Sequence, residues 1–506
     1  MDFPRRIIPF FIIGLLMAFL ASCGGSSHHP ESRSFTLSFS PIEDMVFSQN
    51  GTIVADALNQ LESVSFSIAT KTGNVSKPVN VSYSFDYLNQ KGLVDEKQKE
   101  INFTVFGLYA DFENSVTVNL HYADGDVQAQ TSAITTAGFV SDAALPAITI
   151  NSSNEQPPVS FIFVRSLPVS PIIIDADGET RWMPKDPGEE IRASFFDGDS
   201  FVVGALRSNA IYRFDWDGSY SAHQIGGSGY GDSHHNIELG KEGLLNTIAF
   251  DDGVEIKPES VAIEATKTGG VLRVWDLDTI VANYITANGE DPSAFVMNDF
   301  DWCHMNSVIY DAANDDVIMS CREDFVISVD YSTNKINWLL GNPGKFWFTN
   351  FPNSLQKLAL TVTGVPPVGQ HALSISADGS QLMLFNNGKG NIKLPDVGDT
   401  LDYSLVSIYD IDPLARTANA VWEFDMDKTI YSDICSSVYR TQSGDMLINY
   451  ATSESRQVAR IMVVNEAKEI LYDASIPKRE SDNHSCRTAY NIEEISLDGL
   501  VIDIAR

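Results

Sequence analysis

Residues 330–338 read Asp-Tyr-Ser-Thr-Asn-Lys-Ile-Asn-Trp, an aspartate and a tight turn followed by a strand that carries a tryptophan. The same order returns in two close copies and three weaker ones, at 175–182, 215–218, 275–278, 410–422 and 465–468. Intervals of roughly 40–80 residues, each holding several short strands, are typical of propeller blades with uneven insertions. The sequence therefore predicts an all-β chain with a six-bladed β-propeller.

The N-terminal third of the chain has a different residue pattern. From residue 35 to 145 apolar and polar residues alternate, with no long stretch of 3.6-residue period, which predicts a small β-sandwich. We therefore expect a signal peptide at 1–22, a tether at 23–34 that starts from an acylated Cys23, the sandwich at 35–145 and the propeller at 160–506. The polar, proline-containing segment 151–158 is expected to be a linker.

The first residues are expected to be a targeting signal. Arg5 and Arg6 precede an apolar run at 7–21 that is short for a membrane span. Residues 20–24, Leu-Ala-Ser-Cys-Gly, resemble a bacterial lipobox, which implies cleavage before Cys23 and acylation of that residue. No aspartate follows Cys23, so we expect an exported protein on the outer membrane facing the periplasm, in contact with the membrane through its lipid anchor alone. An uncleaved anchor and a secreted form are the alternatives.

The charge balance excludes one class of partner. The chain has 34 Lys and Arg against 67 Asp and Glu, a formal net charge of −33. With no basic stripe to replace the counterions of phosphates, nucleic acid is not an expected partner.

A second pattern occurs three times: a histidine, an apolar strand, a turn and a second strand. The histidines are His235, His304 and His371, three of only nine in the chain. Equivalent positions on successive blades converge at the axis of a propeller, so the sequence predicts that three imidazoles meet in one pocket. A later copy at 435–444 lacks the histidine, so the ring is not repeated for structural reasons alone.

Two further polar side chains are expected beside these histidines. Asn306 follows His304 by two residues, so on a strand both point to one face. If Cys303 and Cys321 face each other across a hairpin, His304 and Arg322 are diagonal neighbours on the opposite face. A pocket rich in donors and poor in carboxylates is predicted to bind a tetrahedral oxyanion.

Other interpretations of these residues stay open. Three histidines can bind zinc or copper, but a guanidinium beside a dication is unfavourable and no second-shell carboxylate is evident, so we predict no metal and no cofactor. The histidines can also be structural, Asn306 can satisfy backbone groups, and Arg322 can simply pair with Glu323 or Asp324.

Four cysteines remain once Cys23 is acylated. An exported protein meets an oxidising compartment, so two disulfides are expected, with three possible pairings. Cys303 and Cys321 lie in one predicted hairpin, which favours their pairing and leaves Cys435 for Cys486. Free, buried thiols are the alternative.

Several segments together resemble the bacterial aryl-sulfate sulfotransferases, the type that takes sulfate from a phenolic ester and not from a nucleotide donor. The segment 301–307, Asp-Trp-Cys-His-Met-Asn-Ser, is close to that family's Asp-Trp-x-His-x-Asn-Ser. Further matches occur at 105–117, 231–236, 320–322, 329–330, 338–341, 369–372 and 384–388. The resemblance covers most of the chain and is strongest between residues 170 and 390.

The resemblance implies a propeller with an N-terminal sandwich and a covalent sulfohistidine intermediate. The nucleophile maps to His371, and His304, Asn306, Arg322 and His235 map to positions that grip the sulfuryl oxygens and handle the phenolic proton. Two successive displacements of this kind predict ping-pong kinetics. The sequence does not choose between His235 and His304 as the general acid.

The sequence departs from the family pattern at two positions, since Asn236 and Ala372 stand where aspartate is common. These changes are expected to alter tautomer control of the adjacent imidazoles without removing them. The predicted partners are small-molecule aryl sulfate donors and phenolic acceptors, with homodimerisation through the sandwich as a further option. The alternatives are an aryl sulfate hydrolase on the same pocket and a lipid-anchored propeller that only binds or scaffolds.

Overall fold

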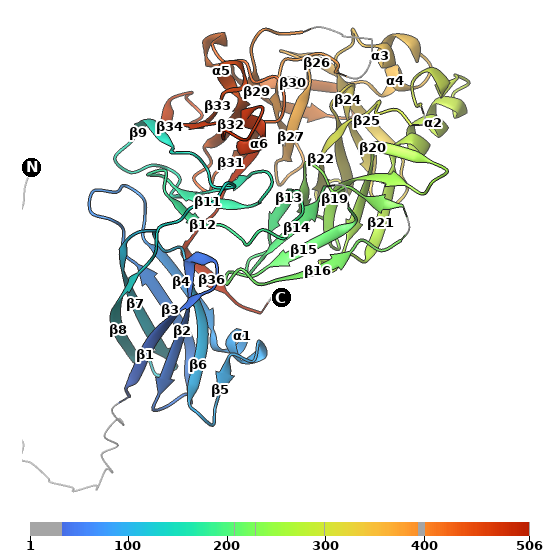
Figure 1. The fold of residues 1–506 in the computed structure, drawn as a ribbon. Coiled ribbons are helices and arrows are strands. Elements are labelled where there is room, and N and C mark those ends of the chain that lie inside the picture. Colours follow the sequence, from blue (N-terminus) through green and yellow to red (C-terminus); the bar gives the residue numbers. More distant parts are fainter. Residues whose placement is uncertain (1–32, 207, 228, 298, 393–399, 505–506) are drawn as a thin grey trace, which may run out of the picture.

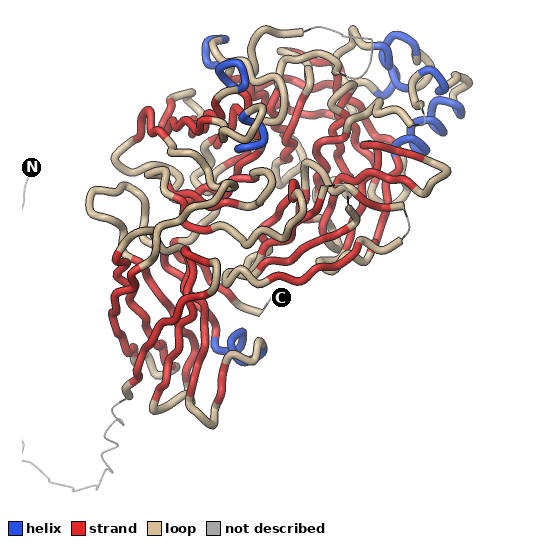
Figure 2. The backbone as a smooth tube through the Cα atoms, viewed as in Figure 1, coloured by secondary structure: helices blue, strands red, loops and turns tan. Residues whose placement is uncertain are grey.

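The computed structural model describes residues 33–206, 208–227, 229–297, 299–392 and 400–504. They form an N-terminal unit of two sheets and a larger body of six sheets (Figure 1). Strands dominate and the helices are short (Figure 2), so the all-β prediction is confirmed. None of the helices in these ranges is long and apolar enough to cross a membrane. The predicted signal peptide, Cys23 and most of the tether lie outside the described residues.

The N-terminal unit pairs two antiparallel layers around a shared core. One sheet has the order β1 (Phe35–Ile42), β2 (Met45–Ala55), β6 (Glu100–Phe106), β5 (Val94–Asp95). The other has the order β36 (Asp498–Ile502), β4 (Val79–Ser84), β3 (Leu61–Ile68), β7 (Glu113–Tyr122), β8 (Val127–Thr135). Buried and partly exposed residues alternate along β4, as expected for a strand with one face in a core.

One strand of this unit comes from the far end of the chain. β36 lies parallel to β4, with Leu500 opposite Val81 and Ile502 opposite Tyr83. Residues 498–502 were expected within the C-terminal domain, but they complete the N-terminal sheet instead. Both ends of the chain therefore build this layer.

The larger body consists of six sheets that follow one another along the chain. The first three have the strand orders β12 (Thr180–Trp182), β11 (Ile172–Asp175), β10 (Phe161–Arg165), β35 (Asn491–Glu494); β13 (Ile191–Phe196), β14 (Phe201–Ala205), β15 (Ala210–Phe214), β16 (Tyr220–Gln224); and β17 (Tyr230–Gly231), β19 (Leu244–Asp251), β20 (Ile256–Ala265), β21 (Val271–Asp276), with β18 (Ile237–Leu239) also paired to β19.

The other three have the strand orders β22 (Met305–Asp311), β23 (Asp316–Cys321), β24 (Phe325–Asp330), β25 (Ile336–Gly341); β26 (Thr361–Thr363), β30 (Thr417–Phe424), β29 (Leu405–Asp412), β28 (Gln381–Asn386), β27 (Gln370–Ile375); and β31 (Ser437–Arg440), β32 (Met446–Thr452), β33 (Val458–Val464), β34 (Ile470–Pro477), β9 (Thr149–Ser153). β9 overlaps the segment expected to be a linker, and its ladder with β34 explains why a polar stretch is ordered there.

Neighbouring sheets contact each other mainly where one edge strand meets the next sheet. The contacts run from β13 to β18, then to β22, β27 and β31, and from β31 to β35. β35 in turn is hydrogen-bonded to β10, and β10 contacts β13. A strand from the C-terminal region thus joins the last sheet of the series to the first.

Helices are confined to loops between strands. They are α1 (Phe85–Gln90), α2 (Leu277–Ala287), α3 (Phe346–Asn350), α4 (Leu355–Leu358), α5 (Ser453–Arg456) and α6 (Ser485–Thr488), with two 3-10 turns at Pro292–Ala294 and Met426–Lys428. The longest, α2, begins at Asp276, whose side chain accepts a hydrogen bond from the Thr279 backbone N–H.

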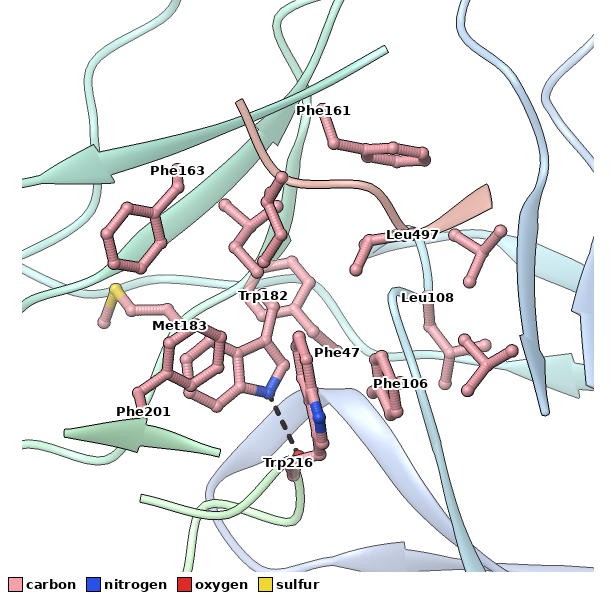
Figure 3. Close-up of a cluster of buried hydrophobic side chains, with 14 of the residues drawn as sticks. Phe47, Phe106, Leu108, Phe161, Phe163, Trp182, Met183, Phe201, Trp216 and Leu497 are labelled. Carbon is pink, nitrogen blue, oxygen red and sulfur yellow. Dashed lines mark hydrogen bonds between the residues drawn. The ribbon is translucent and has the colours of Figure 1, made fainter. Parts of the chain in front are cut away.

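An aromatic cluster joins the N-terminal unit to the first two sheets of the body (Figure 3). The Trp216 ring stacks on Phe106 with 3.8 Å between centroids, and Trp182 meets it edge-on. The carbonyl of Trp216 accepts hydrogen bonds from Trp182 Nε1 at 3.0 Å and from the Ser48 hydroxyl at 2.8 Å. Because one tryptophan serves both units, their cores are continuous.

We expect Trp216→Ala to lower the free energy of unfolding by about 3–5 kcal/mol, since it deletes a buried aromatic ring shared by two cores. Urea unfolding followed by circular dichroism measures this loss. Trp422→Ala is the matched control, because that ring is only partly buried and packs at the edge of a later sheet. An equal loss in both variants would contradict the assigned role of Trp216.

Candidate active site

The three histidines singled out from the sequence lie together. The ring centroid of His235 is 5.5 Å from that of His304 and 5.9 Å from that of His371. They come from three successive sheets: His235 precedes β18, His304 immediately precedes β22, and His371 lies in β27. The edge strands that contact each other thus bring three imidazoles to one point.

The backbone at this point repeatedly adopts left-handed conformations. The φ angles are 61° at His235, 49° at His304, 51° at Ala372 and 60° at Cys435. Residues with a β-carbon adopt this conformation at a cost and are found there mainly at functional sites. The same left-handed conformation at Cys435 shows that this turn recurs before β31, where the sequence pattern has no histidine.

Arg322 lies beside His304, but not through the pairing expected from the sequence. The ladder places Met305 opposite Cys321, with an irregularity between Met305 and Ser307, so Cys303 precedes the paired strand. Arg322 approaches because its backbone N–H donates to the His304 carbonyl at 3.3 Å. The bulge overrides the simple two-residue alternation on which the sequence argument relied.

The Arg322 side chain is buried and partly committed. Its Nη1 donates to Glu323 Oε1 at 2.9 Å and its Nη2 to the Asp433 carbonyl at 3.4 Å. The ion pair with Glu323 is the structural alternative noted from the sequence. Among the described residues, however, no group accepts a hydrogen bond from the buried Nε of Arg322. One donor of the guanidinium is therefore available to a ligand.

His371 is held as a neutral imidazole with a defined tautomer. Its Nδ1 lies 2.5 Å from Asn387 Oδ1 and 3.3 Å from the Gly369 carbonyl, both of which accept hydrogen bonds. Nδ1 therefore carries the proton, and Nε2 carries the lone pair. Burial, the Arg322 cation and His304 together hold the pKa of His371 well below its usual 6.5. The ring is thus prepared to act as a nucleophile.

Asn387 is fixed by the chain that follows β30. Its Nδ2 donates to the carbonyls of Ser432 at 2.5 Å and Cys435 at 3.1 Å. Those donations orient the amide so that its oxygen faces His371. The sequence motif included Asn387, but no pattern linked it to residues 432–435.

His304 has the opposite electrostatic character. Its Nδ1 lies 2.5 Å from Glu259 Oε2 and 2.7 Å from Asp301 Oδ2, and its backbone N–H donates to Asp301 Oδ1. Burial alone would lower the pKa of His304, but the two carboxylates raise it to about 9. His304 is therefore an imidazolium at neutral pH, and its ring and that of neutral His371 both face His235, at 5.5 and 5.9 Å between centroids.

The expectation of a pocket poor in carboxylates was wrong. Asp301 belonged to a quoted motif, but Glu259 lies on β20, far from any histidine in sequence, and gave no signal. Strand β20 reaches the site because it pairs with β19, whose sheet carries His235.

His235, Glu259 and His304 together offer ligand atoms within 4.8 Å of one another, a spacing that a metal ion can use. Two ligands of one tetrahedral zinc ion lie roughly 3.3 Å apart, given bonds of about 2.0–2.1 Å. The 2.5 Å between His304 Nδ1 and Glu259 Oε2 is instead the distance of a close ion pair, and the hydrogen bond of this nitrogen runs to Asp301 Oδ2 at 2.7 Å. This geometry favours an imidazolium held between two carboxylates over a set of metal ligands.

Two asparagines connect the site to its surroundings. Asn306 donates from Nδ2 to the Gln370 carbonyl at 2.8 Å, which ties β22 to the strand of His371. Asn236 accepts from the Val308 backbone N–H and donates to Glu238 Oε1 at 2.9 Å. An aspartate at 236 would face that glutamate, so the amide fits this departure from the family pattern.

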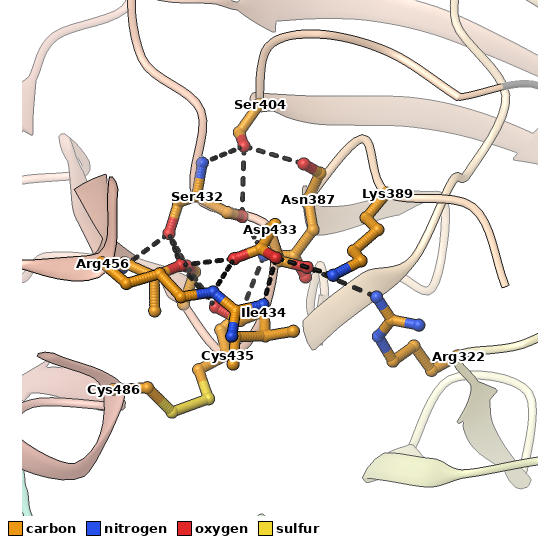
Figure 4. A network of polar contacts seen from close by, with 12 residues as sticks. Arg322, Asn387, Lys389, Ser404, Ser432, Asp433, Ile434, Cys435, Arg456 and Cys486 are labelled. Atoms are coloured by element: carbon orange, nitrogen blue, oxygen red, sulfur yellow. Dashed lines mark hydrogen bonds and ion pairs between the residues drawn. A yellow bond between two sulfur atoms is a disulfide. The ribbon is translucent and has the colours of Figure 1, made fainter. Parts of the chain in front are cut away.

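A buried carboxylate, that of Asp433, forms a polar network beside Arg322 (Figure 4). Asp433 binds Lys389 Nζ at 2.8 Å and Arg456 through two hydrogen bonds, and its carbonyl accepts from Arg322. Burial alone would raise the pKa of Asp433, but Arg456 and Lys389 lower it to about 2. Sequence analysis missed this network, because its members come from separate loops.

The sequence profile of the Arylsulfotransferase (ASST) family matches residues 149–490, more than half of the chain. The chain belongs to the arylsulfotransferase family. A second profile, the arylsulfotransferase Ig-like domain, matches residues 50–137. The family resemblance noted from the sequence is confirmed.

Two curated relatives of this chain carry the name arylsulfate sulfotransferase AssT. That of Escherichia coli O6:H1 (strain CFT073) is 25% identical over 330 residues, covering 53% of this chain and 54% of the relative. That of Lelliottia amnigena is 23% identical over 381 residues, covering 61% and 62%. The match therefore spans between half and two thirds of the length of these relatives.

A gluconolactonase from Xanthomonas campestris is a distant structural match, with a TM-score of 0.31 and 10% identity over 63% of this chain and 86% of that chain. The likeness is too weak to support an argument about fold or function.

The chain contains both disulfides that the sequence favoured, Cys303–Cys321 and Cys435–Cys486. The first joins the residues that directly precede His304 and Arg322. The second follows the loop that orients Asn387 and links it to α6. Each bond therefore fixes one wall of the site.

Replacing Cys303 and Cys321 together by serine is expected to lower the free energy of unfolding by about 3 kcal/mol, and replacing Cys435 and Cys486 by about 4, because the loops span 18 and 51 residues. Urea unfolding of the two double variants, with reduced wild type alongside, measures both losses. A smaller loss for the 51-residue loop would show that loop entropy does not dominate.

Proposed function

We propose that this arylsulfotransferase moves a sulfuryl group from an aryl sulfate to an acceptor phenol through a sulfohistidine at His371. The observation that carries the proposal is a neutral imidazole, with its Nε2 lone pair available, beside a second imidazole held as a cation. The family assignment and the name of the two relatives support the same reaction class.

In the first step His371 Nε2 attacks sulfur. The N–S bond forms as the bond between sulfur and the phenolic oxygen breaks, and the departing phenolate takes a proton from His304. A pKa of about 9 suits this acid, because a phenol of pKa about 10 accepts its proton readily. Between His235 and His304, the two carboxylates favour His304 as the acid.

In the second step the acceptor reverses the exchange. The phenolic oxygen attacks sulfur, the N–S bond breaks, and the phenolic proton returns to the now neutral His304. Both imidazoles recover their starting states, so no external acid or base is consumed. Because the first phenol leaves before the second attacks, the kinetics are ping-pong.

The remaining hydrogen-bond donors stabilise the charge on the sulfuryl oxygens. Transfer of a sulfuryl group, like that of a phosphoryl group, mainly requires in-line positioning and stabilisation of the equatorial oxygens. The buried Arg322 guanidinium supplies one donor at Nε, and Asn306 lies on β22 two residues after His304, whose ring is 5.5 Å from that of His235. Arg322, His304 and Asn306 are therefore the proposed substrate-binding residues, and no cofactor or metal takes part.

The proposed architecture is a six-bladed propeller preceded by a sandwich. Six sheets in chain order, the contacts between their edge strands and the ladder between β35 and β10 support it. In this proposal the sandwich spans about residues 35–145 together with β36, and the propeller includes β9 and then continues from about residue 160. Cleavage and acylation at Cys23 place the enzyme on the outer membrane facing the periplasm, with a homodimer as a further possibility in solution.

The direct test uses the domain without residues 1–23, a chromogenic aryl sulfate and an acceptor phenol. We expect phenol-dependent release of the chromogen, a new sulfate ester, and loss of both in His371→Ala by at least about 10²-fold. His223→Ala is the matched control, because His223 lies on the edge strand β16, away from the three-histidine cluster. Mass spectrometry should find one added SO₃ group on the peptide of His371 when donor is present alone.

Release of free sulfate without acceptor would redirect the proposal to hydrolysis. No turnover of any aryl sulfate by the folded protein would instead favour a binding protein.

The pH profile provides a second test. The pKa of His304 is raised to about 9, so its acidic form is present below that pH and is lost as the pH rises through it. The pKa of His371 is depressed, so its nucleophilic form persists well below pH 6.5. We expect kcat/KM for the donor to stay level from about pH 6.5 to 8 and to fall about tenfold per pH unit above about 9. A fall that begins near pH 7 would contradict the assignment of His304.

A further inference from the structure

A carboxylate beside a site for an anionic substrate needs an explanation. Glu259 Oε2 lies 2.5 Å from His304 Nδ1, where its negative charge opposes binding of a sulfate ester. Asp301, three residues before His304, already contacts the same nitrogen at 2.7 Å. One carboxylate would suffice to fix the tautomer of His304, so the second must serve another purpose.

The two carboxylates approach from different parts of the fold. Asp301 is local, and it also accepts the backbone N–H of His304. Glu259 extends from β20, on the neighbouring sheet, with its side chain 23% exposed. Its Oε2 is also 4.0 Å from His234 Nε2. Glu259 therefore reaches the site independently of the turn that carries His304.

The charges around His304 show what the second carboxylate compensates. The His235 ring lies 5.5 Å from that of His304, and Arg322 donates its backbone N–H to the His304 carbonyl. Glu259 and Asp301 lie against Nδ1, and His234 is 4.0 Å from Glu259. Burial and the neighbouring cation both favour loss of the His304 proton. If Asp301 were the only carboxylate at His304, it would have to oppose both effects by itself.

We propose that Glu259 is a positioning residue which, together with Asp301, clamps His304 so that its Nε2 keeps a proton for the departing phenolate. This inference rests on the proposed transferase function. Glu259 does not contact the reacting atoms in this arrangement, and it acts through His304 alone. The clamp sacrifices some affinity for the anionic donor and gains a proton at the leaving oxygen.

The consequence depends on the leaving group. A strongly acidic phenol, such as a nitrophenol, departs as the anion and needs little help, whereas an unsubstituted phenol needs the proton. If Glu259 acts through the acid, its loss must slow poor leaving groups far more than good ones. A purely structural role would slow all donors alike.

The test compares Glu259→Gln with wild type in two measurements. The first is an NMR titration of His304 in the apo protein, where we expect its midpoint to fall by about 1–3 pH units. The second is donor turnover at pH 8, where phenyl sulfate should slow about tenfold or more and nitrophenyl sulfate by less than about threefold. Glu259→Asp, which retains the charge, should recover part of both effects.

Glu255→Gln is the matched control, since it removes the same charge just before β20 from an exposed side chain that pairs with Lys257. It should leave both measurements unchanged. An unchanged His304 titration in Glu259→Gln, or equal slowing of both donors, would overturn the proposal. If wild type transfers no sulfuryl group at all, the proposed function fails, while the titration still decides whether Glu259 holds the His304 proton.

Discussion

The site depends on the ladder between β35 and β10. Arg165 and Asn491, 326 residues apart in the chain, are joined across this ladder by a buried hydrogen bond of 2.9 Å. Because the last sheet contacts the first through this strand, the edge strands of the other sheets are held in a fixed order around one centre. The direct contacts of β18 with β22 and of β22 with β27 then bring the three histidines together.

The centre holds two imidazoles in opposite protonation states. His371 is kept neutral by burial and by the nearby cations, whereas His304 is kept charged by two carboxylates. The division is local, because the chain as a whole has a formal net charge of −33. Neighbouring side chains provide it: Asn387 sets one tautomer, and Asp301 from the preceding turn with Glu259 from β20 sets the other. The contacts between edge strands bring the histidines together, and the side chains around them set their protonation states.

The sequence identified the side chains that meet at the candidate site but not the groups that surround them. His235, His304, His371 and Arg322 were identified from repeated patterns and family motifs, and both disulfides from position in a hairpin and elimination. The strand pairing expected to place Arg322 beside His304 was wrong, because a bulge shifts Met305 opposite Cys321. Short-range geometry of this kind depends on left-handed turns, such as that at His304, which a strand pattern does not reveal.

The residues that tune the site were not recognisable in the same way. Glu259 and Asp433 are single carboxylates on a strand and a loop, and among the 67 acidic residues nothing marks them. Their importance comes from distances of 2.5–3.0 Å to groups that are remote in sequence.

By itself the sequence determined the all-β class, the family and the identity of the convergent imidazoles, because alternation, repeated turns and motifs are local properties of a chain. Only the tertiary structure decided that β36 completes the N-terminal sheet and that one histidine is neutral while its neighbour is charged. Strand partners and pKa values depend on groups brought together by folding, and the chain order does not record those neighbours.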